Sequence, residues 1–337
     1  MLSLKKLTWE VLVSASINVS APGKLMLFGE HAVVYGYSCI VTAVDQRVYV
    51  KAGFNGKDEL VVNAPQLGVS GYRKKVDRLC DQEMPKQVSF IEAVVRRFYQ
   101  NYGLVRGLEI ATRSDFSHSY GFGSSSAITM ATATALSKLY LIKLSKKQLF
   151  DLCYQAVLDI QGVGSGFDLA AALWGKTLLY KKGARLVKKM ILDQLPIVVC
   201  YSGVKADTPT LVRQVAEFKR KKPRKVKQIF NKIEQLVLQT EKVIIQKDWQ
   251  GVGKLMNTNQ RLLEDLGVST LKLEKLNKTA LNAGAYGAKL SGAGGGDCMI
   301  AVCLQSKRDA VEQALIKAGG EIMPVKLNSK GVTWQKK

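Results

Sequence analysis

The segment APGKLMLFGEHAVVYG brings a lysine, an acid and a histidine close together in the sequence. Pro22 and Gly23 are expected to shape a turn that delivers Lys24 beside Glu30 and His31. Ammonium, carboxylate and imidazole groups can together position a substrate that carries several oxygen atoms. On these residues alone, an ordinary strand and turn with incidental charges explains the segment equally well.

A second segment, GFGSSSA, starts at Gly121 and joins two glycines to three consecutive serines. Glycine lets a backbone approach a ligand closely, and the free N–H groups of a helix N-terminus attract an anion. The segment therefore suggests a loop that holds phosphate groups or a Mg²⁺ ion. The alternative is that the serines are ordinary helix N-caps.

A third segment, KLSGAGGGDCMIA, has four glycines within residues 292–296. So many glycines destabilise a regular strand, which calls for a strained turn or a close approach of the backbone to a ligand. A plain flexible loop is the alternative. The apolar residues that follow the glycines indicate that the run is embedded in a sheet.

The segment GVGSGFDLAAALWG places Asp168 after a glycine turn and before small apolar residues. A carboxylate in such a place is partly withdrawn from water, yet nearby donors can hold it, so it could act as a base. The alternative is an acid at the N-cap or in the first turn of a helix.

Two common nucleotide-binding signatures are absent from the sequence. Gly175, Lys176 and Thr177 resemble the end of a P-loop, but position 170 is alanine where the upstream glycine should be. GFGSSS lacks the third glycine of the dinucleotide-binding pattern, and strands and helices do not alternate regularly. Neither a P-loop enzyme nor a dehydrogenase is expected.

The elements that would hold these motifs form an α+β pattern without an internal repeat. Residues 15–50 read as strand, turn and strand. Further strands are expected at 108–114, at 197–204, within 287–304 and at 321–325, and helices at 125–141, 146–160, 209–246 (interrupted at Pro223), 271–284 and 307–318. The strand at 197 suggests a boundary between two domains, 1–190 and 191–337.

Composition limits the class of protein. The 337 residues are 47% hydrophobic and 23% charged, which excludes a disordered, collagen-like or coiled-coil chain. The net charge of +23 favours an anionic partner without naming it. No apolar run is long enough for a membrane span, and the start of the chain lacks a signal-peptide layout. No membrane partner is therefore expected.

Cysteine and histidine usage argues against a structural metal site. Six cysteines stand without CxxC spacing, and His31 and His118 are the two histidines. This pattern indicates reduced thiols, not zinc ligands, and a cytoplasmic protein.

Two basic stretches offer a non-enzymatic alternative. FKRKKPRKVK and the run from Tyr72 to Lys75 could bind RNA, whose affinity would then fall steeply with salt. The favoured interpretation is a solvated helix face and loop, without a nucleic-acid partner, because RNA binding leaves the three glycine segments unexplained.

Taken in this order, the three glycine segments resemble the GHMP kinase superfamily over nearly the whole chain. Within it, GEHAVVYG and the stretch MNTNQRLLEDLGVSTLKLEKL look like mevalonate kinases, whereas QGVGSGFDLAAALWG, ADTPTLVRQV and GGGDC look like phosphomevalonate kinases. Mevalonate kinase is the favoured resemblance and phosphomevalonate kinase the alternative. A kinase of a sugar or another alcohol in the superfamily is a further one.

The resemblance implies an N-terminal domain like ribosomal protein S5 domain 2 and a C-terminal ferredoxin-like domain, with the active site between them. It implies transfer of the ATP γ-phosphate to the 5-hydroxyl of mevalonate, or to the phosphate of 5-phosphomevalonate, in isoprenoid precursor synthesis. ATP and Mg²⁺ would be the cofactors, and a homodimer is expected from the family alone.

The resemblance also implies roles for individual residues. Asp168 would act as base or orient the acceptor hydroxyl, and Lys24 would offset transition-state charge. The residues implied to bind ATP are Gly121, Phe122, Gly123, Ser124, Ser125, Ser126, Gly294 and Gly295. The residues implied to bind the substrate are Lys24, Glu30, His31, Asp168, Thr208 and Ala293.

One metal ligand departs from the family pattern. Ser125 matches the serine that binds Mg²⁺, but the usual glutamate upstream of the catalytic acid is replaced by Val157. Asp159 is the nearest carboxylate and is the candidate substitute. Phosphomevalonate kinases also lack that glutamate, so the gap bears on the acceptor as well.

Overall fold

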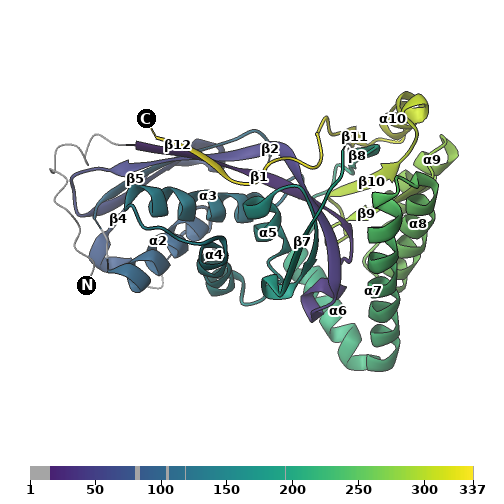
Figure 1. The fold of residues 1–337 in the computed structure, drawn as a ribbon, viewed down its shortest axis with the longest axis horizontal. Coiled ribbons are helices and arrows are strands. Elements are labelled where there is room, and N and C mark those ends of the chain that lie inside the picture. The colour runs from purple at the N-terminus through teal and green to yellow at the C-terminus, as the bar shows by residue number, and fades with distance from the viewer. Residues whose placement is uncertain (1–15, 80–83, 104–105, 118, 194, 337) are drawn as a thin grey trace.

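A computed structural model describes residues 16–79, 84–103, 106–117, 119–193 and 195–336. Its strands form one eight-stranded and one four-stranded sheet, which lie toward opposite ends of the long axis in Figure 1. His118 and Cys80, one of the six cysteines, fall outside the described residues. Among the described residues, no helix is long and apolar enough to cross a membrane.

The eight-stranded sheet has the order β12-β1-β2-β5-β3-β4, with β6 paired to β2 and β7 to β6. Neighbouring strands are antiparallel except β3 and β5, which are parallel. The strands are β1 (Ser16–Phe28), β2 (Ser38–Phe54), β3 (Glu59–Ala64), β4 (Val69–Lys75), β5 (Leu108–Ser114), β6 (Thr177–Lys181), β7 (Leu186–Met190) and β12 (Thr333–Lys336).

Helices cover one face of this sheet, below it in Figure 1. They are α2 (Ser89–Tyr102), α3 (Ser124–Leu139), α4 (Lys146–Gln161) and α5 (Phe167–Trp174). The start of β1 alternates between buried and partly exposed side chains, as expected for a strand with one packed and one solvated face. α3 is buried almost throughout because it packs between the sheet, α2, α4 and α5.

The four-stranded sheet is antiparallel, with the order β11-β8-β10-β9. Its strands are β8 (Ile197–Tyr201), β9 (Gly287–Ser291), β10 (Cys298–Val302) and β11 (Glu321–Ile322). The helices of this half are α6 (Thr208–Lys221), α7 (Pro223–Ile245), α8 (Trp249–Asp265), α9 (Leu271–Asn282) and α10 (Arg308–Lys317). Short 3₁₀ helices lie at Ala32–Tyr35, Pro65–Leu67, Val76–Arg78, Lys182–Ala184 and Gln305–Lys307.

Each strand and helix expected from the sequence is present within a few residues of its predicted bounds. The turn expected at Pro22 and Gly23 is wrong, because β1 continues through both residues with a register shift before Lys24. Gly23 instead lets β1 lie close to the backbone of Phe122, because a Cβ at this position would lie 2.9 Å from the carbonyl oxygen of Phe122. The domain boundary at residue 190 stays a prediction; it falls between β7 and β8, and β12 returns to pair with β1.

The basic run FKRKKPRKVK spans the end of α6 and the start of α7, and Pro223 begins the second helix as expected. Most of its side chains are exposed, while Val226 is buried in the helix interface. The run therefore occupies a solvated helical hairpin.

Candidate active site

A cavity of about 280 Å³ lies where the two halves of the chain meet, and it gathers residues from all the glycine segments. Of the site residues predicted from the sequence, those that line it are Lys24, Glu30, His31, Gly121, Gly123, Ser124, Ser125, Asp168, Thr208 and Ala293. Those that the structure does not bring to the cavity wall are Phe122, Ser126, Gly294, Gly295 and Asp159.

The GFGSSSA segment forms a tight loop that leads into α3. Gly121 and Gly123 both have φ of +73°, a left-handed conformation that favours glycine. No side chain of the described residues caps the helix, so the serines do not act as N-caps and the first N–H groups of α3 are left without a capping partner there. A free helix N-terminus carries partial positive charge and favours a bound anion.

Lys24 and Asp168 flank this loop on its cavity side. A Cβ at Gly123 would lie 3.0 Å from Cε of Lys24 and 3.7 Å from Cβ of Asp168. The Lys24 ammonium donates to the carbonyl oxygen of Gly121 at 2.8 Å and is 9% exposed. A cation and a carboxylate therefore stand next to the candidate phosphate loop.

Asp168 lies in the first turn of α5, as the structural alternative proposed, and it also lines the cavity. Its Oδ1 accepts a hydrogen bond from the amide of Leu169 at 3.1 Å. The carboxylate is thus oriented by its own helix while it remains accessible to a ligand. The two interpretations of this residue are compatible.

His31 follows β1 and is 6% exposed. Its Nε2 lies 2.8 Å from the carbonyl oxygen of Ala293. A carbonyl oxygen only accepts, so Nε2 carries the proton in this contact and the neutral ring keeps a lone pair on Nδ1. The imidazole can therefore accept a hydrogen bond from a hydroxyl in the cavity.

Burial lowers the pKa of His31 below its ordinary value of 6.5, and the contact with Ala293 only partly opposes this. Because the unfolded chain binds a proton more readily at this position, the folded protein loses stability as pH falls from 6.5 toward the lower folded pKa. Urea unfolding at pH 7.5 and 5.5 should show a larger loss of stability for the wild type than for His31→Gln. Equal losses would mean that His31 is not a buried neutral group.

Glu30 touches the cavity wall, but its side chain is 0% exposed and pairs with the equally buried Lys289. Burial raises the pKa of Glu30 and lowers that of Lys289, and the attraction within the pair opposes both changes. The carboxylate therefore pairs with a lysine of β9 in the protein interior.

The third glycine segment reaches the cavity through Gly292 and Ala293. The two glycines predicted to bind ATP pack elsewhere: a Cβ at Gly294 would lie 2.1 Å from the carbonyl oxygen of Val268, and one at Gly295 would lie 2.7 Å from the Leu211 side chain. These glycines thus permit close packing within the chain itself.

Two charged cavity residues were not identified from the sequence. Lys205 is exposed, and Asp297 accepts a hydrogen bond from the amide of Ala206 at 2.9 Å. The Asp297 carboxylate lies directly against Gly121, where a Cβ would be 2.5 Å from Oδ2. Burial raises the pKa of Asp297, while Lys24 and Lys205 oppose this. In the sequence, the only signal for Asp297 was its position at the end of the glycine run, in GGGDC.

Asp159, the candidate second metal ligand, lies on α4 and forms ion pairs with Arg96 and Arg97 of α2. Burial opposes ionisation, but the two guanidinium groups outweigh it and hold the pKa of Asp159 below its usual range. Its oxygens are thus committed to α2, and a role in metal binding is not supported by this geometry.

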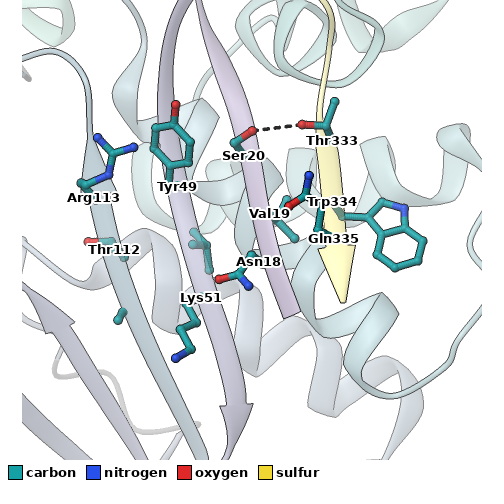
Figure 2. A pocket seen from close by; sticks show the side chains of 12 residues that line it. Asn18, Val19, Ser20, Tyr49, Lys51, Thr112, Arg113, Thr333, Trp334 and Gln335 are labelled. Atoms are coloured by element: carbon teal, nitrogen blue, oxygen red, sulfur yellow. Dashed lines mark hydrogen bonds between the residues drawn. The ribbon is translucent and has the colours of Figure 1, made fainter. Parts of the chain in front are cut away.

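A larger hollow of about 370 Å³ lies on the solvated face of the first sheet, shown in Figure 2. Within it, Ser20 and Thr333 lie 3.0 Å apart, and Arg113 stacks on Tyr49. It contains neither a helix N-terminus nor a carboxylate. Because the chemical groups converge elsewhere, we place the active site in the smaller cavity.

Comparison with known proteins identifies the family of the chain. The family models for the N-terminal and C-terminal domains of GHMP kinases match residues 89–176 and 240–321, and the galactose-binding signature of galactokinase matches residues 12–54. The mevalonate kinase of Pyrococcus abyssi is 36% identical over 327 residues, covering 94% of this chain and 97% of that protein. The chain belongs to the mevalonate kinase family of GHMP kinases.

Solved structures extend this result. The mevalonate kinase of Methanococcus jannaschii is 27% identical with a TM-score of 0.78, covering 93% of this chain and 98% of that one. A phosphomevalonate kinase of Streptococcus pneumoniae is 18% identical with a TM-score of 0.76, covering 92% and 99%, and shares the fold. The α+β GHMP kinase fold predicted for this mevalonate kinase family member is therefore confirmed.

Proposed function

We propose that the protein transfers the γ-phosphate of ATP to the 5-hydroxyl of mevalonate, giving 5-phosphomevalonate for isoprenoid precursor synthesis. One observation carries the proposal: Lys24 and Asp168 flank the free N-terminus of α3 in a single cavity. Family membership and the names of the relatives support the same acceptor.

ATP would place its phosphates against the loop from Gly121 to Ser125. The left-handed glycines bring the backbone close, and the uncapped N–H groups of α3 complement negative charge. Phosphoryl transfer depends mainly on positioning and on charge stabilisation, and this loop supplies both. Phe122 and Ser126 would support the loop from behind, since both are buried.

The acceptor hydroxyl would lie between Asp168 and the γ-phosphate. Asp168 accepts the hydroxyl proton as the oxygen forms its bond to phosphorus and the bond between the β,γ-bridging oxygen and the γ-phosphorus breaks. Lys24 stabilises the negative charge that develops on the transferred group. The hydrogen bond from Lys24 to Gly121 holds the ammonium in place before substrate arrives.

Other groups would bind the rest of the acceptor. Nδ1 of His31 accepts a hydrogen bond from a second hydroxyl, and Thr208 and Ala293 border the same space. Lys205, exposed at the cavity wall, attracts the carboxylate of mevalonate.

The donor set fits a Mg²⁺ ion that binds together with ATP. Among the described residues no three His, Cys, Asp or Glu side chains cluster as a metal site, which suits an ion held largely by phosphates and water. The Ser125 hydroxyl lines the cavity at the start of α3 and would be one protein ligand. When bound, Mg²⁺ neutralises part of the phosphate charge.

Replacing Ser125 by alanine should therefore weaken Mg²⁺·ATP binding by at least about tenfold, because a protein ligand to the ion is lost. Ser126→Ala is the matched control, since Ser126 is the next residue but is buried outside the cavity wall. Titration with Mn²⁺, followed by electron paramagnetic resonance in the presence of a non-hydrolysable ATP analogue, measures the effect. Equal affinities for the two variants would remove Ser125 from the metal site.

Charge in the cavity favours mevalonate over phosphomevalonate. Apart from the paired Glu30, its described lining has two lysines, Lys24 and Lys205, and two carboxylates, Asp168 and Asp297. An acceptor with a single carboxylate suits this balance of charges better than one with an additional phosphate.

A cytoplasmic location and a homodimer remain predictions.

A coupled assay of ADP release tests the acceptor, with Mg²⁺·ATP and mevalonate, 5-phosphomevalonate or galactose offered separately. The proposal expects kcat/KM to be highest for mevalonate. Turnover of phosphomevalonate alone would show that the QGVGSGFD and GGGDC segments indicated the acceptor correctly. Turnover of galactose alone would point to the sugar-kinase alternative.

A further inference from the structure

We infer that Glu30 and Lys289 form a positioning pair that fixes the acceptor side of the cavity, and that neither side chain contacts the substrate. The inference rests on the proposed function. It replaces the prediction that Glu30 binds substrate directly, because the Glu30 side chain is 0% exposed.

The pair connects the two halves of the chain. Glu30 follows β1 of the first sheet, and Lys289 belongs to β9 of the second. Their ion pair is completely buried, and the Lys289 ammonium also donates to the carbonyl oxygen of Leu290. The segment after β1 of the first sheet is therefore tied to the middle of β9 of the second sheet in the protein interior.

Two further hydrogen bonds join the same strand ends. Ser291 Oγ donates to the carbonyl oxygen of Met26 at 2.8 Å, and the His31 ring contacts Ala293 at 2.8 Å. His31 and Ala293 both line the cavity, and His31 adopts a left-handed backbone with φ of 58°. The ion pair lies beside these contacts and holds His31 and Ala293 in register.

The chemistry of the pair argues for positioning more than for net stability. Among the described residues, Glu30 Oε2 is buried without a hydrogen-bond partner, and the backbone amides of Glu30 and Gly292 help Lys289 to favour the charged carboxylate. Buried ion pairs often contribute no more stability than a neutral pair of similar shape, whereas a lone buried charge is costly. Loss of either partner alone would leave a buried, unpaired charge. The pair therefore acts mainly by holding the residues beside the cavity in a fixed geometry.

The test replaces both partners by neutral residues of similar shape, Glu30→Gln with Lys289→Met. This double variant avoids the lone buried charge that each single variant would leave. The control applies the same exchange to another ion pair, Glu92→Gln with Lys74→Met, which joins the buried Glu92 of α2 to the partly buried Lys74 of β4 and lies outside the cavity wall. Each protein is compared with the wild type for KM of mevalonate, KM of ATP and backbone hydrogen exchange.

The Glu30 and Lys289 double variant should raise KM for mevalonate by about 10- to 100-fold, leave KM for ATP within about twofold, and speed exchange in residues 287–297. The control should change neither KM. An unchanged KM for mevalonate, or an equal rise for ATP, would overturn the inference. If the wild type does not phosphorylate mevalonate, the proposed function fails. Unchanged hydrogen exchange at residues 287–297 in the double variant would refute the positioning pair independently of that result.

Discussion

Asp168→Asn should lower kcat by about 10²- to 10⁴-fold while the protein remains folded. The amide keeps the shape of the side chain and can still accept from Leu169, but it cannot take the hydroxyl proton. KM for ATP should change little, because Asp168 is proposed to hold the acceptor and lies on α5, outside the phosphate loop. Steady-state kinetics at saturating ATP, together with thermal unfolding, measure both expectations.

Asp159→Asn provides the matched control for this substitution. Asp159 is also a helical aspartate of the first half, but its carboxylate is held by Arg96 and Arg97 and lies outside the cavity wall. The change should reduce thermal stability and leave kcat within about twofold. A large loss of kcat in Asp159→Asn would mean that the second metal ligand predicted from the sequence is real.

Lys24→Met should lower kcat by about 10²- to 10³-fold. Methionine fills the space beside Gly123 and Phe167 but removes the charge that offsets the transferring phosphate. It also removes the hydrogen bond to Gly121, so a modest loss of ATP affinity is expected in addition. Calorimetric titration with a non-hydrolysable ATP analogue separates binding from the chemical step.

Lys205→Met is the control for Lys24→Met, because Lys205 lines the same cavity but is exposed, whereas Lys24 is buried and hydrogen-bonded to Gly121. It should raise KM for mevalonate and leave kcat within about threefold, since it acts on binding of the acceptor. If Lys205→Met lost as much kcat as Lys24→Met, then Lys24 would have no special role in the transferring charge.

Many of the residues that the sequence suggested for the site meet in one cavity, because their residue types restrict what they can do. Lys24, Ser125, Asp168 and Ala293 are far apart in the chain, yet all line one cavity. Glycines beside serines and acids let the backbone approach a ligand closely, as at Gly121 and Gly123, or pack against another part of the chain, as at Gly294 and Gly295. The resemblance to GHMP kinases then supplied their common location.

The sequence predicts partners across the chain poorly because nothing local reveals them. Lys289 reads as an ordinary residue of a strand, and its partner Glu30 is 259 positions away. Asp159 attracted attention because it is near Asp168 in sequence, but helix α4 turns it toward α2. β12 was not predicted, because only pairing with β1 makes a strand of Thr333–Lys336.

Phosphorus NMR of a reaction containing Mg²⁺·ATP, mevalonate and the wild-type protein tests the central claim most directly. The account predicts a new phosphomonoester signal coupled to the protons of the C5 methylene, appearing together with ADP and absent in Asp168→Asn. Release of inorganic phosphate without that signal, or a phosphorylated product that forms equally in Asp168→Asn, would contradict it.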